Sequence, residues 1–509
     1  MKYAVIQPES ATERSLRTYA LDQSLAPLVS ALQQCADREN AAFHTPGHKR
    51  GQGISDLHRQ LFGAAVFRAD LPELPDLDNL FAPEGAILQA QTLAADAFGA
   101  ERTWFLANGS TCGIQAAILA TCGPGDKLIL PRNVHTSAIT GLILSGAIPI
   151  YVSPSYSSDW DISLGVSPEI VGQALTAHPD AKAVLVVSPT YHGVCSDLAA
   201  IAALTHAHNI PLIVDEAHAP HFAFHPELPI SALAAGADIA VQSAHKVLSA
   251  FTQAALLHMQ GDRIDRTRVS QSLQLTQSTS PSYLLLGSLD AARQQMATDG
   301  QSSMAQTILL ADQAAQALSH LPGLRVLQPQ WPDPPTGVLG DRTRLTVDVS
   351  ALGITGFRAD DLLHTSLSVT AELPALRHLM FIVSLGNTQS DITQLITGFK
   401  QLCWQHPPTP LSPIPPRSHS LNFPCPTPLS HILPRQAFFA SHHRLPTAQA
   451  VGHICAETIC PYPPGIPTLM PGELISKEAI TYLQTVLRAG GHLTGCSDLS
   501  LETLLVVKT

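Results

Sequence analysis

The chain has 509 residues, of which 45% are hydrophobic and 14% are charged, and its formal net charge is −11 at pH 7. This length predicts two or three domains, and the apolar content suffices for large cores, which excludes a disordered chain. The negative charge, without any run of Lys or Arg, argues against a nucleic-acid-binding protein.

Nothing in the sequence indicates a membrane or a secretory route. The first residues, MKYAVIQPESATER, lack the apolar core of a signal peptide, and no stretch approaches the roughly 18 apolar residues of a transmembrane helix. The nine cysteines are scattered and form no CxxC pair, which is typical of reduced thiols. We therefore expect a cytoplasmic protein without membrane contact.

Residues 1–75 are expected to form an N-terminal helical segment followed by a loop, and residues 76–330 a large α/β domain. In the latter, β-rich runs alternate with helical stretches such as DLAAIAALTHAHN, which predicts repeated βα units. Most of these runs lack period-two alternation, as expected of parallel strands covered on both faces. They are KLILP, IPIYVSP, AKAVLVVSPT, IPLIVDEAH, ADIAVQSAH and AALLHMQ. The pattern predicts a mostly parallel, doubly wound sheet with ligands at the carboxyl ends of its strands.

Three further segments follow along the chain. Residues 331–403 predict a smaller α/β domain, with RTRLTVDVS and ALRHLMFIVSL as its β-rich runs. Residues 404–433 contain QHPPTPLSPIPPRSHSLNFPCPTPLS, whose proline content is typical of an extended linker. Residues 434–509 return to a globular composition and predict a C-terminal domain.

The tetrapeptide DEAH, which begins at Asp215 after a β-rich run, also occurs in helicases. A helicase needs a phosphate-binding loop, GxxxxGK[ST], and none of the eight lysines follows that pattern, so this interpretation is rejected. His218, His221 and His225 have a spacing that could ligate zinc. Pro220 interrupts a helix there and no thiol or carboxylate completes the set, so we predict no metal site.

Lys246 differs from the other lysines in its setting. It lies in GADIAVQSAHKVLSAFTQAALLH, which has no acidic residue between Asp238 and Asp262. Burial without a counter-charge lowers the pKa of an amine and makes it a nucleophile towards aldehydes. The alternative is an ordinary lysine whose amine reaches the surface. Ser243 and His245 flank it with donors suited to a phosphate, which favours the first interpretation.

Other strand ends supply the groups that an enzyme with pyridoxal 5′-phosphate needs beside this lysine. Asp215, 31 residues before Lys246, would keep the pyridine nitrogen protonated. Ser110 and Thr111 open an apolar helix in FLANGSTCGIQAAILA, which is typical of an anion site. His135 follows KLILP and is placed to stack on a ring. Each feature alone is an ordinary cap or surface residue, but the combination predicts a site for this cofactor.

These residues lie in longer motifs that resemble the Orn/Lys/Arg decarboxylases, a family of fold-type I pyridoxal-phosphate enzymes. The matching stretches are TPGHKRG, ELPDLDNLFAPEGAI, FGAERTWFLANGSTCGIQAAILA, PRNVHTSAITGLILSGAIPIYV, SPTYHGVCSDL, VDEAHAPHFAFHPELPISALAAGADIAVQSAHKVLSAFTQAALLH, STSPSYLLLGSLDAAR and AETICPYPPGIPTLMPGE. The resemblance implies an aspartate-aminotransferase-like fold over residues 40–400 and a family C-terminal domain over 434–509. It also implies decarboxylation of arginine, lysine or ornithine to agmatine, cadaverine or putrescine, in polyamine metabolism.

The resemblance gives each site residue a role. Lys246 is the Schiff-base lysine, and Asp215 contacts the ring nitrogen. His135 stacks above the ring, Ala217 packs below it, and Lys246 or His135 returns a proton to the α-carbon. The other expected cofactor contacts are Ser110, Thr111, His218, Ser243 and His245.

The resemblance also implies an oligomer. The STS at residues 278–280 resembles a segment that reaches the phosphate across a dimer interface, so we expect a homodimer or a larger homo-oligomer. Thr136 and Ala244 depart from the family pattern, which commonly has lysine and threonine at these positions. Neither change removes a group that the chemistry requires.

The sequence leaves alternatives open for the substrate-binding residues and for the reaction. A cationic amino acid needs a carboxylate partner for its distal group, and Glu73, Asp76, Asp78 and Glu457 are the candidates. A fold-type I aminotransferase or carbon–sulfur lyase would share the lysine and the aspartate. A non-catalytic regulatory relative is a further alternative, but such a protein needs none of the cofactor groups that this chain retains.

Overall fold

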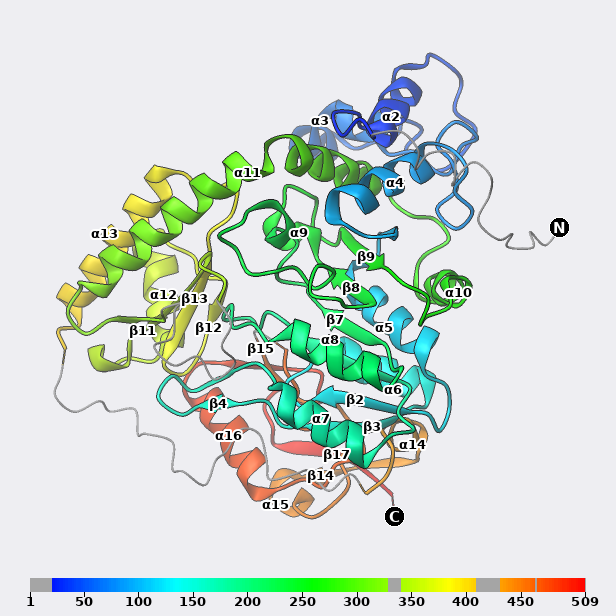
Figure 1. Ribbon diagram of the computed structural model, residues 1–509. Helices are drawn as coiled ribbons and strands as arrows, with labels where there is room; N and C mark the ends of the chain where they lie inside the picture. The colour runs from blue at the N-terminus through cyan, green and yellow to red at the C-terminus, as the bar shows by residue number, and fades with distance from the viewer. Residues whose placement is uncertain (1–20, 328–339, 409–430, 463–464, 509) are drawn as a thin grey trace.

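The computed structural model describes residues 21–327, 340–408, 431–462 and 465–508, so most of the predicted proline-rich linker lies outside the described residues. A seven-stranded sheet forms the centre of the molecule, in the order β1-β9-β8-β7-β6-β2-β3 (Figure 1). Its strands are β1 (Arg102–Leu106), β2 (Lys127–Pro131), β3 (Ile148–Val152), β6 (Ala183–Val187), β7 (Leu212–Asp215), β8 (Ile239–Gln242) and β9 (Ala255–Met259).

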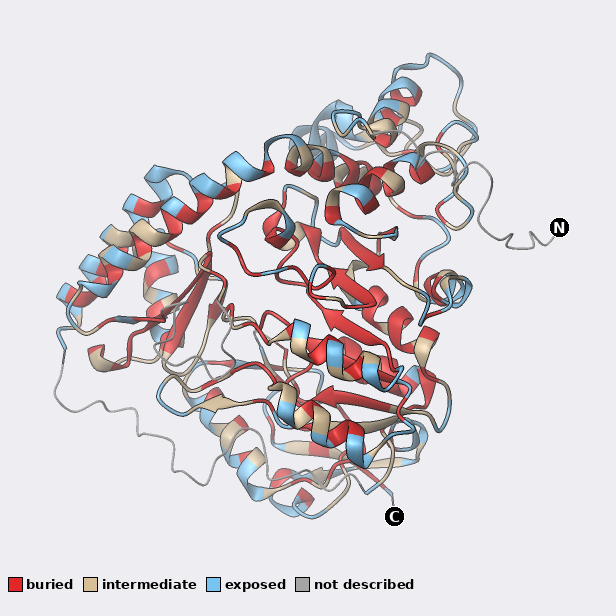
Figure 2. Cartoon of the chain, in the orientation of Figure 1, coloured by how far each residue is buried: buried red, intermediate tan, exposed pale blue. Residues whose placement is uncertain are grey.

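The predicted mostly parallel, doubly wound sheet is confirmed. Strands β3, β2, β6, β7 and β8 pair in parallel, and β9 runs antiparallel to both of its neighbours. Every residue of β6, β7 and β8 is buried, because helices cover both faces of the sheet (Figure 2). One face packs against α5 (Gly109–Thr121), α6 (Thr136–Ser145) and α10 (Arg266–Thr276), and the other against α7 (Pro168–Ala177) and α8 (Leu198–Ala207).

A 37-residue helix, α11 (Tyr283–Ser319), connects this layer to the rest of the molecule (Figure 1). Its N-terminal half packs against the N-terminal helices α2 (Pro27–Asp37) and α4 (Ala86–Phe98). Asp290 and Arg293 form a buried ion pair on this half, and Asp290 accepts a hydrogen bond from the amide of Leu28. Helix α3 (Asp56–Ala69) lies beside α2.

The C-terminal half of α11 packs on a small α/β domain. A four-stranded sheet has the order β10-β11-β13-β12 and is covered by α12 and α13. The elements are β10 (Arg325–Val326), β11 (Arg344–Asp348), α12 (Gly356–Ser366), β12 (Leu373–Pro374), β13 (His378–Ile382) and α13 (Gln389–Gln405). The two β-rich runs that the sequence indicates here are β11 and β13.

The C-terminal domain has its own small core and lies below the edge of the large sheet in Figure 1. Its elements are α14 (Pro434–Phe439), β14 (His442–Pro446), α15 (Thr447–Ala450), β15 (Cys460–Tyr462), α16 (Lys477–Arg488), β16 (His492–Thr494) and β17 (Thr503–Val507). Arg435 at the start of α14 donates to the carbonyl oxygens of Ile143 and Leu144 in α6. This contact ties the domain to the large one.

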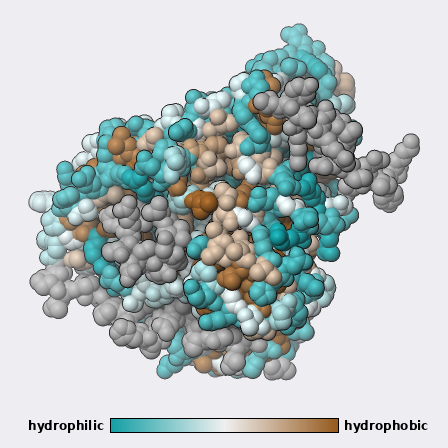
Figure 3. All heavy atoms as spheres, viewed as in Figure 1, coloured by the Kyte–Doolittle hydropathy of each residue, from teal (hydrophilic) through white to brown (hydrophobic). Residues whose placement is uncertain are grey.

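The surface in Figure 3 is largely hydrophilic at its rim, with apolar residues gathered near its centre. Among the described residues, no helix combines the length and the apolar character needed to cross a bilayer.

Candidate active site

Three strand ends of the large sheet bring together the residues that the sequence singles out. Asp215 is the last residue of β7, and β8 leads directly into the short helix α9 (Ala244–Val247), which carries Lys246. His135 follows β2 and caps the N-terminus of α6. The ends of parallel strands lie on one edge of the sheet, which is why residues more than a hundred positions apart meet there.

Lys246 is enclosed by aromatic and imidazole rings. Its Nζ lies 2.9 Å from Nε2 of His218 and 5.6 Å from the ring centroid of Tyr191. Burial is the main reason that the pKa of Lys246 is lowered to about 8; the charge of Asp215 opposes this shift and that of Arg344 adds to it. Burial also lowers the pKa of His218 well below its ordinary value, so His218 is neutral and accepts a hydrogen bond from the amine.

Asp215 is a buried carboxylate without a matching cation. Oδ1 accepts a hydrogen bond from the amide of Ala217 at 3.2 Å, and no described Lys or Arg forms an ion pair with it. Burial raises the pKa of Asp215, while the charge of Lys246 opposes the shift. A cation that donates a hydrogen bond is therefore what this site lacks. Ala217 is itself buried, and its carbonyl oxygen accepts a hydrogen bond from the amide of Ser243.

His135 is held in a fixed orientation. Its Nδ1 accepts a hydrogen bond from the amide of Ser137 at 3.2 Å and lies 2.9 Å from Oγ of Ser137. Burial, with a smaller contribution from Lys246, lowers the pKa of His135 to about 4, so the ring is neutral near pH 7. Gly465 of the C-terminal domain lies beside this ring. A Cβ atom built on Gly465 would be 3.9 Å from Nε2 of His135.

An anion site lies at the N-terminus of α5. Gly109, the first residue of the helix, has φ of 75°, which suits glycine, and Ser110 follows it. The hydroxyl of Ser243 donates to that of Ser110 at 2.7 Å, and Thr111 is exposed beside them. His245 lies within α9, and its Nδ1 donates to the carbonyl oxygen of Ala254. Free amides and two hydroxyls at a helix N-terminus form a cradle for a phosphate.

The segment that resembles an interface motif lies next to this cradle. Residues 278–280 are exposed, and the amide of Ser278 donates to Oδ1 of Asn108, the N-cap of α5. Within one chain, the segment therefore borders the same helix N-terminus as Ser110.

Tyr191, Arg344 and Glu372 belong to this site and were missed by the sequence interpretation. Arg344 is buried, and it donates to the carbonyl oxygen of His218 at 2.5 Å. Its Nε lies 3.6 Å from Oδ2 of Asp341 in an ion pair, and Nη1 has no hydrogen-bond partner among the described residues. The charge of Glu372 acts on both Lys246 and Arg344. Tyr191 follows β6 in SPTYHG, so the strand-end rule could have found it. Nothing in the sequence indicates Arg344 or Glu372, which the small domain contributes.

The four carboxylates considered for the substrate have local hydrogen-bonding roles. Asp78 accepts from the amides of Gly85 and Ile87 and so caps α4. Glu73 accepts from Asn79, and Asp76 pairs with Arg38. Glu457 accepts from the amides of Ser497 and Leu505 inside the C-terminal domain. Each of these four carboxylates is therefore engaged in contacts within the protein.

Two other histidines of the DEAH region also have protein partners. His221 is fully buried and lies 3.3 Å from Oδ2 of Asp341. Nδ1 of His225 accepts from the amide of Glu227.

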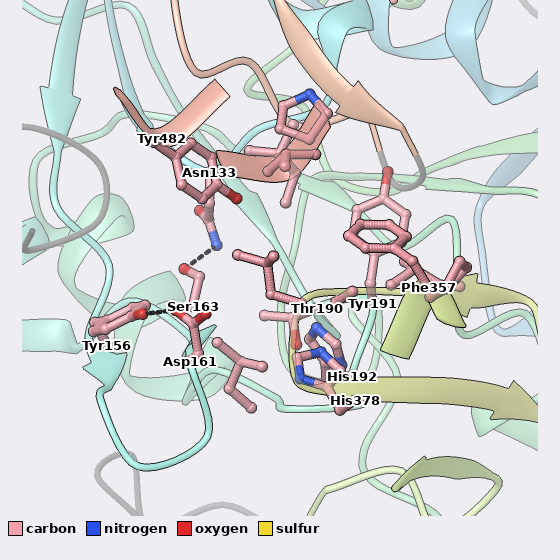
Figure 4. Close-up of a pocket in the computed structure, with 18 of the residues that line it drawn as sticks. Asn133, Tyr156, Asp161, Ser163, Thr190, Tyr191, His192, Phe357, His378 and Tyr482 are labelled. Carbon is pink, nitrogen blue, oxygen red and sulfur yellow. Dashed lines mark hydrogen bonds between the residues drawn. The ribbon is translucent and has the colours of Figure 1, made fainter. Parts of the chain in front are cut away.

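A cavity of about 110 Å³ lies beside the lysine site, where the large, small and C-terminal domains meet (Figure 4). The large domain contributes Asn133, Asp161 and the residues after β6, among them Tyr191. The small domain contributes Phe357 and His378, and the C-terminal domain contributes Ile466 and Tyr482.

The sequence has matches along almost its whole length. The family model described as Orn/Lys/Arg decarboxylase, major domain, matches residues 26–337, and the model for the C-terminal domain of the same family matches residues 428–498. The arginine decarboxylase of Bacillus subtilis (strain 168) is 39% identical over 488 residues, which cover 96% of this chain and 99% of that protein. That of Bacillus anthracis is 37% identical, with 96% and 99% covered. Lysine decarboxylase A from Pseudomonas aeruginosa has the same fold, with a TM-score of 0.82 at 24% identity over 98% of this chain and 82% of that one.

Proposed function

Because this chain belongs to the Orn/Lys/Arg decarboxylase family, we propose that it decarboxylates arginine to agmatine and carbon dioxide with pyridoxal 5′-phosphate as its cofactor. The observation that carries the proposal is Lys246, whose amine contacts Nε2 of His218 and whose pKa burial lowers to about 8 against the opposing charge of Asp215. Arginine is chosen among the basic amino acids because relatives of the same length are named arginine decarboxylase. The product is a precursor of polyamines.

The residues fit this cofactor. The aldehyde would bond to Lys246, and the ring would lie between His135 and Ala217. Asp215 is a buried carboxylate and would accept a hydrogen bond from the protonated ring nitrogen. The positive charge of that nitrogen would lower the pKa of Asp215, which burial raises. Ser110, Thr111, Ser243 and His245 surround the cradle for the phosphate. Bound in this way, the cofactor accepts the electron pair that carbon dioxide leaves behind.

The lowered pKa of Lys246 matters both for its bond to the cofactor aldehyde and for the proton that it returns to the substrate. At pH 7 a group with a pKa near 8 is uncharged in roughly a tenth of molecules, about 300-fold more than at the ordinary value of 10.5. His218 orients the amine through the 2.9 Å contact. We assign the proton that returns to the α-carbon to Lys246, because His135 has a pKa of about 4 and carries no exchangeable positive charge near pH 7.

The proposal is tested with purified protein, the cofactor, and arginine, lysine or ornithine in separate reactions. Carbon dioxide and the matching amine are measured, and arginine is expected to give the highest kcat/KM. An oxo acid without carbon dioxide would establish the aminotransferase alternative instead. Lys246→Ala is expected to remove the borohydride-reducible link between cofactor and protein, whereas Lys182→Ala, a strand-edge lysine outside the site, is expected to keep it.

We also propose that the enzyme is a cytoplasmic homodimer. The support for the dimer is the exposed segment 278–280 beside the phosphate cradle, where a second subunit could contribute a hydroxyl. Sedimentation at micromolar concentration tests this assembly, and a monomer that retains full activity contradicts it.

A further inference from the structure

Tyr191 connects the cavity at the domain junction to the surroundings of Lys246. The ring of Tyr191 lies 5.6 Å from Nζ of Lys246 and 4.5 Å from the ring of His218, and the same residue lines the cavity. The volume of about 110 Å³ is far below the roughly 300–1,000 Å³ of pockets for whole small molecules. The cavity therefore suits the distal end of a ligand whose other end reacts at Lys246.

The charge of the lining favours a cation. Asp161 is the one carboxylate among the lining residues, which include neither Lys nor Arg. His192 and His378 also line the cavity, and burial lowers the pKa of both, that of His378 to about 4. Both imidazoles are therefore neutral near pH 7, so Asp161 contributes the formal charge among the described lining residues, while Arg377 acts on His378 from outside the lining.

His378 points to a missing ligand. It is 2% exposed, and neither of its ring nitrogens has a hydrogen-bond partner among the described residues. Its ring packs edge-on against that of His192, with centroids 4.9 Å apart, and both lie at the wall of the cavity in Figure 4. An unpaired buried polar group is costly, and a ligand that donates a hydrogen bond would remove that cost.

The acceptors lie on more than one wall. Asn133 donates through Nδ2 to Oγ of Ser163 at 2.9 Å, which leaves its carbonyl oxygen as an acceptor. The hydroxyl of Tyr156 donates to Asp161 and fixes the carboxylate at the opposite side from His378 (Figure 4). Tyr191 and Phe357 add aromatic rings to the lining at one side of the cavity (Figure 4).

We propose that this cavity binds the guanidinium group of arginine, with Asp161 as its counter-ion and His378 as a neutral acceptor. A guanidinium has five N–H donors in one plane and stacks on aromatic faces, so it can reach acceptors on several walls at once. The compact ammonium of lysine has three donors and suits such a spread arrangement less well. The inference rests on the proposed function and locates the specificity of that reaction.

The test compares Asp161→Asn with the control Asp159→Asn in the full-length, cofactor-loaded protein. Asp161 has φ of 54°, a conformation that Asn adopts readily, so the backbone is preserved. Asp159 is two residues away in the same connection, but it pairs with Arg325 at 2.9 Å and does not line the cavity. Each variant is titrated with agmatine and with cadaverine by calorimetry, and KM for arginine is measured in parallel.

We expect Asp161→Asn to weaken agmatine binding and raise KM for arginine by about 30-fold, since a charge pair at a partly buried site is lost. Asp159→Asn should stay within twofold of the wild type in both measurements. His378→Phe keeps the ring packing and removes the acceptor, so it should weaken agmatine binding by about fivefold more than cadaverine binding. This second variant also serves if Asp161→Asn unfolds at a lower temperature.

The outcomes separate the two proposals. Agmatine affinity that is unchanged in Asp161→Asn and in His378→Phe overturns the cavity assignment, whether or not the wild type releases carbon dioxide. A wild type that releases none from any basic amino acid, but binds agmatine in an Asp161-dependent way, overturns the proposed reaction and supports the guanidinium site.

Discussion

Arg132 and Glu473 join the large domain to the C-terminal domain through a buried ion pair. Nη2 of Arg132 lies 3.0 Å from Oε2 of Glu473, and the side chains are 3% and 2% exposed. Arg132 also donates to the carbonyl oxygens of Pro467 and Thr468, at 2.7 and 3.2 Å. We predict that Glu473→Leu lowers the free energy of unfolding by about 3–5 kcal/mol, because it leaves the guanidinium buried without a counter-ion.

The double variant Arg132→Met/Glu473→Leu is expected to recover most of this loss. Nε of Arg132 and Oε1 of Glu473 have no hydrogen-bond partner among the described residues, so the pair compensates its own desolvation only in part. Apolar side chains of similar size remove both charges together, at the expense of the two bonds to the carbonyl oxygens. The double variant should therefore lie within about 2 kcal/mol of the wild type.

Urea unfolding followed by circular dichroism measures these differences, with Asp180→Ala as the control. Asp180 pairs with Lys127 at the surface, where its side chain is 64% exposed, so its removal should cost less than about 1 kcal/mol. If Glu473→Leu costs no more than Asp180→Ala, or if the double variant is no more stable than Glu473→Leu, the ion pair does not act as a buried contact between the domains.

Four further outcomes follow from single sites. Burial lowers the pKa of His258 to about 3, so as pH falls below about 6.5 this residue is protonated in the unfolded chain before it is protonated in the folded one. Protonation of the unfolded chain should lower the free energy of unfolding by about 2 kcal/mol at pH 5. Urea titrations should show this loss in the wild type and not in His258→Asn. Asp78→Ala should lower the unfolding free energy by about 1–2 kcal/mol with unchanged KM for arginine, since Asp78 caps α4. Gly113→Ala should weaken cofactor retention in gel filtration, because its Cβ would lie 2.7 Å from side chains of Leu106 and Val241 and displace α5. The rate at which apoprotein takes up pyridoxal phosphate, measured by absorbance, should rise up to a pH of about 8 and then level off. The uncharged amine of Lys246 is the reacting form, and its pKa is about 8.

The sequence predicts the large domain and its strand ends well, for a physical reason. Strands β6, β7 and β8 are covered on both faces, so their apolar runs are continuous and stand out from the flanking helices. Polar residues that directly follow such strands must lie at one edge of the sheet. The position of Asp215, Lys246 and His135 after such strands therefore predicts that they lie close together, and the structure places all three at that edge.

The residues that the sequence does not predict come from contacts between domains. Arg344 opens a strand of the small sheet, and it reaches His218 only because the small domain packs against the end of β7. The acidic segment that contains Asp78 suggests a cation site, but Asp78 accepts hydrogen bonds from the backbone at the start of α4, and its acidic neighbours in the segment have protein partners of their own. Composition reveals charge, whereas the partner of each charge depends on tertiary packing.

The expected cofactor contacts and the proposed substrate-binding cavity come from different parts of the molecule, and this affects substrate specificity. The expected cofactor contacts belong to one sheet and the turns that follow its strands, so they are fixed by the core of the large domain. The cavity for the distal group combines Asp161 from that domain, His378 from the small domain and Ile466 from the C-terminal domain. A substitution in the cavity can therefore change the preferred basic amino acid while Lys246 and Asp215 stay in place. A change in domain packing, as in Glu473→Leu, should instead affect the cavity and the His135–Gly465 contact together, because the loop at residues 465–473 contributes to both.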